Sequence, residues 1–91
     1  MNRINVAGAA TTVCTGNPGI LDRIVVNKAV ASGVITIYDN TAASGTKIGT
    51  ITHPATLLQN QYALEYGCRF MTGLTVVTSS TDDITVVWRN S

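Results

Sequence analysis

The chain alternates apolar and polar residues in short segments, which is the pattern of β-strands that bury one face. In 34–39, for example, Ile35 and Ile37 alternate with Thr36 and Tyr38. Turn-forming residues separate the segments, as in Gly-Asn-Pro-Gly at 16–19 and Ser-Ser-Thr-Asp-Asp at 79–83. The pattern predicts strands at 10–15, 20–30, 34–39, 47–52, 62–66, 68–72, 74–78 and 84–89, with only 55–61 compatible with a helical turn.

Strands that recur about every 11 residues predict an all-β fold. We expect one domain over 1–91: a small antiparallel β-sandwich of jelly-roll type, or a barrel, with about seven or eight short strands. Segment 1–10 is either an edge strand of this domain or an N-terminal arm that pairs with a neighbouring chain.

The alternation also predicts which side chains face the core. In 20–30 we expect Ile20, Ile24 and Val26 to face inward. Asp22 and Arg23 should then point to opposite faces and not pair, and Gly67 should end the strand at 62–66. The predicted core is Ile24, Val26, Ile35, Ile37, Leu64, Val76, Val86 and Trp88, with Thr36, Thr75 and Thr85 on the opposite faces of their strands.

The composition supports a folded β-protein without a strong electric field. Val, Ile and Thr supply 32 of the 91 residues, and these β-branched types suit a pleated sheet. Hydrophobic residues make up 45% and charged residues 12%, which argues against intrinsic disorder. A net charge of +1 argues against a nucleic-acid platform.

Candidate chemical groups are few and scattered. His53 precedes Pro54 at a strand end, without the glycine elbow of a hydrolase nucleophile. Asp82 and Asp83 lie in a predicted turn, where aspartate is favoured for local hydrogen bonding; with Asp39 they are the only acidic set that could bind Ca²⁺. We therefore predict no enzyme, no cofactor and no metal site. Cys14 and Cys68 lack metal-ligand spacing. The sequence shows neither a secretory signal nor a membrane-length apolar run, so we expect a chain made in the cytoplasm, with both cysteines reduced and buried as small core residues. A Cys14–Cys68 disulfide would form only if two strands place these residues within about 7 Å of each other.

Several segments resemble one group of proteins. They are Pro-Gly-Ile-Leu-Asp-Arg-Ile-Val-Val-Asn at 18–27, Ile-Tyr-Asp-Asn-Thr at 37–41, Ala-Ser-Gly-Thr-Lys-Ile-Gly-Thr-Ile at 43–51, Thr-Gly-Leu-Thr-Val-Val-Thr at 72–78 and Asp-Ile-Thr-Val-Val-Trp at 83–88. Together they make the chain similar to short proteins that tailed bacteriophages encode near their virion structural genes. The resemblance implies a non-enzymatic component of the virion.

Within that class, we expect a capsid decoration (cement) protein that binds and stabilises the head lattice. Its partners would be the major capsid protein or other virion proteins, with neither nucleic acid nor membrane involved. A closed homo-oligomer, most often a trimer, suits a lattice with local threefold axes. The alternatives are a tail, neck or fibre component, or a carbohydrate-binding adhesive module with Tyr38, Tyr62, Tyr66 and Trp88 standing in solvent.

The expected partner-contact surface comprises apolar residues that no strand periodicity demands. Leu57, Leu58, Phe70 and Met71 lie near Pro54 and Gly73, so end loops could present them as one patch. If 1–10 is an arm, Ile4 and Val6 join this surface.

Overall fold

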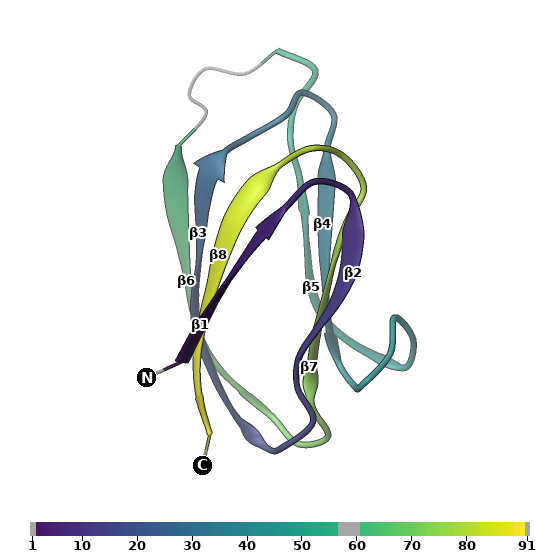
Figure 1. The fold of residues 1–91 in the computed structure, drawn as a ribbon, viewed down its shortest axis with the longest axis vertical. Coiled ribbons are helices and arrows are strands. Elements are labelled where there is room, and N and C mark those ends of the chain that lie inside the picture. The colour runs from purple at the N-terminus through teal and green to yellow at the C-terminus, as the bar shows by residue number, and fades with distance from the viewer. Residues whose placement is uncertain (1, 57–60, 91) are drawn as a thin grey trace.

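The computed structural model describes residues 2–56 and 61–90, which form eight strands and no helix (Figure 1). The predicted all-β fold is therefore confirmed. The molecule measures 37 × 24 × 17 Å. The strands are β1 (Asn2–Ala7), β2 (Ala10–Thr15), β3 (Gly19–Lys28), β4 (Val34–Asp39), β5 (Thr46–Thr52), β6 (Tyr62–Phe70), β7 (Leu74–Thr78) and β8 (Asp83–Asn90).

The strands form two antiparallel four-stranded sheets that pack face to face (Figure 1). Sheet A has the order β1-β8-β3-β6 and sheet B the order β2-β7-β4-β5. The first strand thus pairs with the last, the second with the seventh, the third with the sixth and the fourth with the fifth. This is the pairing of one long hairpin rolled into a jelly roll, so the sandwich is confirmed and the barrel alternative is wrong.

Both ends of the described chain lie at the same end of the sandwich (Figure 1). The Asn2 side chain donates a hydrogen bond from Nδ2 to Oδ1 of Asn90 over 3.1 Å. Because β1 pairs with β8 along its whole length, segment 2–7 is an edge strand of its own sandwich.

The core lies between the sheets and contains every predicted residue except Leu64, together with buried residues that the predicted set did not include. Ile35 and Ile37 in sheet B and Ile24 and Val26 in sheet A are fully buried. Leu64 was predicted in this core but is only half-buried, because β6 is an edge strand. The buried hydrophobic residues are Val6, Leu21, Ile24, Val26, Ala29, Ile35, Ile37, Phe70, Leu74, Val76, Ile84, Val86 and Trp88.

A β-bulge in β3 overturns part of the predicted facing. The register between β3 and β8 shifts between Leu21 and Arg23, so the alternation reverses there. Leu21 is consequently buried, whereas Ile20, predicted to face the core, is half-buried. The same bulge invalidates the prediction that Asp22 and Arg23 stay apart, since Arg23 Nε lies 2.8 Å from Asp22 Oδ2.

The prediction that Gly67 ends a strand is also wrong. β6 runs through this position, and Gly67 adopts a φ of 58° within it. Opposite β3, the partners step from Cys68 to Glu65, so β6 carries an additional residue here. Glycine adopts this left-handed conformation without steric penalty, which lets the strand bulge and continue.

The three threonines predicted to lie away from the core differ in their exposure. Thr36 and Thr85 are half-buried on the outer sides of β4 and β8. Thr75 also follows the outer alternation of β7, yet it is fully buried and donates a hydrogen bond from Oγ1 to the carbonyl of Asn40 over 2.7 Å. The loop after β4 covers Thr75 and therefore buries a polar residue that the strand alternation places on the outer side of the sheet.

Candidate functional site

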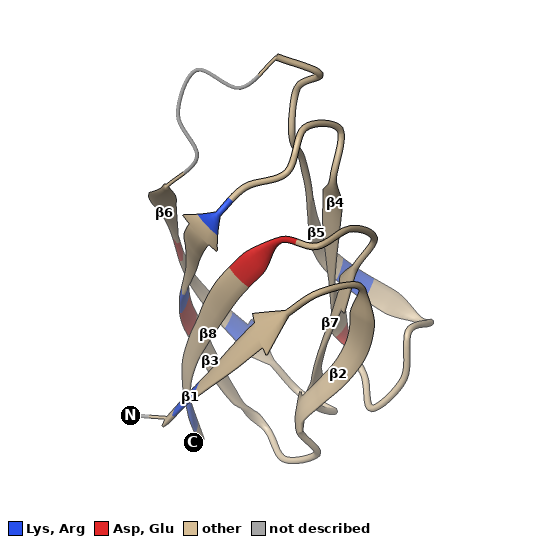
Figure 2. Ribbon diagram, turned by 45° about the horizontal axis from the view of Figure 1, so that its top comes forward, with Lys and Arg blue, Asp and Glu red and all other residues tan. Residues whose placement is uncertain are grey.

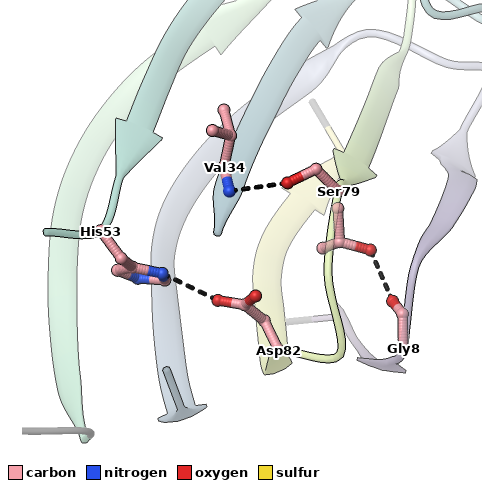
Figure 3. A network of polar contacts seen from close by, with 6 residues as sticks. Gly8, Val34, His53, Ser79 and Asp82 are labelled. Atoms are coloured by element: carbon pink, nitrogen blue, oxygen red, sulfur yellow. Dashed lines mark hydrogen bonds and ion pairs between the residues drawn. The ribbon is translucent and has the colours of Figure 1, made fainter. Parts of the chain in front are cut away.

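One end of the sandwich holds a buried pair of ionisable side chains. His53 follows β5 and Asp82 precedes β8, and His53 Nδ1 lies 2.9 Å from Asp82 Oδ2 (Figure 3). Their side chains are 2% and 0% exposed. This is ion-pair distance, and neither ring nitrogen of His53 nor either carboxylate oxygen of Asp82 makes a hydrogen bond among the described residues.

The surroundings of this pair fix its position. A Cβ on Gly33 would lie only 2.6 Å from Asp82 Oδ1, so the carboxylate occupies space that glycine alone leaves free. The backbone N–H of His53 donates to the carbonyl of Gly33 over 2.9 Å. Tyr62 packs edge-on against the imidazole, with ring centroids 5.7 Å apart, and burial together with the charge of Asp82 raises the pKa of Tyr62.

Hydrogen bonds from other loops close the same end. Val34 N donates to Ser79 Oγ over 2.8 Å (Figure 3). The backbone N–H of Ser79 donates in turn to the carbonyl of Val34 over 3.0 Å. Thr78 donates from Oγ1 to the carbonyl of Gly8 over 2.6 Å. The His53–Asp82 pair is therefore enclosed by loops. This geometry favours a structural role, in which the pair holds these loops together, over proton transfer to a ligand.

The sequence indicated neither the burial of His53 nor its contact with Asp82. His53 was predicted as a loop residue and Asp82 as part of a turn, and both are indeed outside the strands. Only the folding of the chain joins two residues that lie 29 positions apart. Within 2–56 and 61–90, no group of three or more His, Cys, Asp or Glu side chains could hold a metal ion.

At the opposite end, Asp39 holds the turn between β6 and β7. The backbone N–H groups of Met71, Thr72 and Gly73 donate to its carboxylate, the closest contacts being 3.0, 2.8 and 3.4 Å. Partial burial opposes the charged carboxylate, but these N–H groups outweigh it and lower the pKa of Asp39. The turn is thereby fixed with Met71 at its surface.

The outer face of sheet A carries a polar network across three strands. Asn5 on β1 and Asn27 on β3 donate to Asp83 Oδ1 over 2.7 and 3.1 Å, and Asn27 also donates to Thr85 over 3.0 Å. The hydrogen bonds from Asn5 and then from Asn27 lower the pKa of Asp83. The network joins β1, β8 and β3 through side chains as well as through the backbone.

The two cysteines do not bond to each other. Both are free thiols, as predicted. Cys14 on β2 packs against the core, but Cys68 lies half-buried on edge strand β6 of the other sheet and is not part of the core, so the prediction of a core residue is wrong for Cys68. Burial raises the pKa of the Cys14 thiol to about 12. Cys14 thus behaves as a small apolar residue and not as a nucleophile.

The predicted partner-contact residues do not form one patch. Phe70, expected on an end loop, is the last residue of β6 and is fully buried in the core. Val6 is also buried and Ile4 packs against the core, as the edge-strand alternative requires. Met71 is 62% exposed. Leu57 and Leu58 lie outside the described residues.

None of the aromatic side chains is fully exposed to solvent. Trp88 and Phe70 are buried, while Tyr38, Tyr62 and Tyr66 are half-buried. A carbohydrate-binding module needs aromatic faces that stand in solvent, and each of the five aromatic side chains lies at least partly against its neighbours. This arrangement disfavours the adhesive alternative.

The outer side of sheet B carries mainly threonine, valine and tyrosine, and the loop after β4 covers it at Thr75. Two rows of cross-strand partners cross all four of its strands, and such partners project on the same face. One row is Thr11, Val77, Thr36 and Thr50, and the other is Val13, Thr75, Tyr38 and Lys47.

Charged residues are segregated between the sheets (Figure 2). Sheet B carries only Asp39 and Lys47, at the adjoining ends of β4 and β5, and β2 is uncharged along its length. The strands of sheet A carry five basic and three acidic residues: Arg3, Arg23, Lys28, Arg69 and Arg89, with Asp22, Glu65 and Asp83.

The comparisons with known proteins add no family and no structural neighbour to these observations. No helix in the described ranges is long and apolar enough to cross a membrane. A scan against protein-family models, a search of curated proteins and a search of solved structures each returned no match.

Proposed function

We propose that this chain is a non-enzymatic structural protein of a tailed-bacteriophage virion, and specifically a decoration protein that binds and stabilises the head lattice. Jelly rolls are found in viral capsid domains, and also in lectins and cupins, so the topology alone does not select a function. The sequence resemblance selects the virion class. The disfavoured aromatic platform and the closed His53–Asp82 pair are consistent with a role in surface contact.

The observation that carries the decoration role is the segregation of charged residues between the strands of the two sheets (Figure 2). A protein that coats a particle needs one face suited to the shell and another suited to water. Sheet B has the lower charge that protein interfaces favour at their centres, and sheet A has the charge that keeps a coated particle dispersed.

The proposed assembly is a closed homo-oligomer, with three copies around a local threefold axis of the lattice as the expected form. Its partner is the major capsid protein. An oligomer presents several copies of the same face at once, so modest contacts add up to stable attachment.

Composition analysis of purified particles tests this function. We expect the chain in intact heads in hundreds of copies, at positions that a cryo-electron map locates on the outer lattice. A handful of copies at the tail, neck or fibre would instead support the alternative virion role. Absence of the chain from purified particles would refute both.

A further inference from the structure

One of the two rows on sheet B is uncharged and ends at two exposed threonines. Thr11 lies on edge strand β2 and Thr50 on edge strand β5, and both side chains are exposed. Between them, Val77 and Thr36 are half-buried. Val13, in the adjacent row, is 49% exposed and is one of two large hydrophobic residues this exposed among the described residues. The face thus offers methyl and hydroxyl groups to a partner.

Because the outer face of sheet B carries few charges, removing it from water costs less free energy than removing the outer face of sheet A. Burying an unpaired charge in an interface costs free energy, whereas Thr and Val lose little on desolvation when their surroundings are complementary. Lys47 lies at the end of a row, on edge strand β5, where its amine can remain in water. The strands of sheet A carry eight charged residues, so a partner that covers this sheet would have to pair or desolvate many more charges.

The size of the face indicates what kind of partner it suits. Four strands about 4.8 Å apart and about six residues long cover roughly 400 Å² in projection. A standard protein pair buries about 800 Å² on each side. One face is therefore too small to hold a single free partner firmly, but several faces held by one oligomer bind a repeating surface with much higher apparent affinity.

We propose that the outer face of sheet B is the docking face and that its occupant is an uncharged, repeating protein surface, that of the virion shell. This inference rests on the proposed function and assigns the face through which it acts. Sheet A then points to solvent. Since the contact involves few charges, its strength should change less than about twofold between roughly 0.05 and 0.5 M NaCl, because salt screens only charged contacts.

A pair of matched double variants tests the assignment. T11E/T50E places two carboxylates on the outer face of sheet B, and A7E/A63E places two on the outer face of sheet A; each pair occupies exposed positions on the two edge strands of its sheet. We expect T11E/T50E to lose at least about tenfold in affinity for heads that lack the protein, because its charges must be desolvated on docking. A7E/A63E should bind within about twofold of the unaltered chain. T11V/T50V, which keeps the shape without the hydroxyl groups, should also retain binding.

The possible outcomes distinguish failure of the docking-face inference from failure of the proposed decoration function. If the unaltered chain does not bind such heads, the decoration role itself fails. If the unaltered chain binds and T11E/T50E, with unchanged circular dichroism and melting temperature, binds equally well, the docking face is wrong. Loss of binding by A7E/A63E alone would place the contact on sheet A. Sedimentation of the free proteins tests whether a second copy of the chain occupies sheet B instead of the shell. If T11E/T50E turns an oligomer into monomers, a second copy occupies sheet B, and the assignment to the shell is overturned.

Discussion

At the scale of single residues, two kinds of position determine this molecule. Fully buried aliphatic residues such as Ile37 fill the space between the sheets, and polar residues such as Asp39 satisfy backbone groups at the ends. The first kind was predictable, because alternation along a strand identifies it. The second was not, because a carboxylate that accepts N–H groups from a turn more than thirty residues away leaves no local pattern.

Replacement of Ile37 by alanine should destabilise the fold strongly. Ile37 is fully buried, so the substitution removes apolar contacts and leaves a cavity, at a cost of about 2–5 kcal/mol in the free energy of unfolding. Urea denaturation of I37A measures the change. A loss below about 0.5 kcal/mol would mean that this strand presents its other face to the core.

Replacement of Asp39 by asparagine should reduce stability at neutral pH and remove part of its acid dependence. Because the folded-state pKa of Asp39 is lowered, its carboxylate contributes stability above the ordinary value of 3.8, and this contribution disappears as pH falls through the folded-state pKa. We expect D39N to cost about 1 kcal/mol at pH 7, a value reduced for partial exposure, and less below about pH 3.

Thermal melts of the unaltered chain and D39N between pH 2 and 7 measure this difference. D22N is the matched control, since Asp22 accepts from the Arg23 side chain and not from a turn backbone. A constant difference between D39N and the unaltered chain across the whole pH range would contradict the assigned role.

At the scale of elements, the sequence predicted strands well and their irregularities poorly. The alternating segments and turn residues located most of the eight strands within a few positions. The bulges at Asp22 and Gly67 were missed because a bulge is a relation between neighbouring strands, and a single strand's sequence does not state its partner's register. Phe70, assigned to an end loop because it lies near Gly73, is instead the last residue of β6 and is buried.

Deletion of residues 1–6 should lower the melting temperature and leave particle binding intact. β1 covers one edge of sheet A and contributes the buried Val6, so its loss exposes β8 and removes several kcal/mol of apolar burial, or roughly 10 °C or more in melting temperature. V6A offers a milder version in case the deletion does not fold. An unchanged melting temperature with weakened oligomerisation would instead identify the segment as an arm.

At the scale of the whole molecule, polar contacts fasten the two sheets to each other at both ends. His53 follows a strand of sheet B and Asp82 precedes a strand of sheet A, while Asp39 in sheet B binds the turn that leads from sheet A to sheet B. Sequence could not predict these connections, since they depend on which loops the jelly roll brings together.

Single replacements of His53 or Asp82 by alanine should each lower the free energy of unfolding by about 3 kcal/mol, since each leaves a buried polar group without its partner. The H53A/D82A double variant should cost less than the two together, because it leaves neither group behind. Denaturation of the four proteins gives the coupling energy. Additivity within about 0.5 kcal/mol would show that the contact does not stabilise the fold.

The proximity of residues 2 and 90 has a consequence for how this chain could be rearranged. Joining these positions with a short linker would close the chain into a ring without disturbing a strand pair, and the ring could be reopened at the turn between β4 and β5. The β1–β8 pairing, now the most distant along the sequence, would become a local hairpin, and β4–β5 would become the most distant. Because folding rate depends on the sequence separation of contacting residues, such a permutant would reach the same jelly roll by a different order of events.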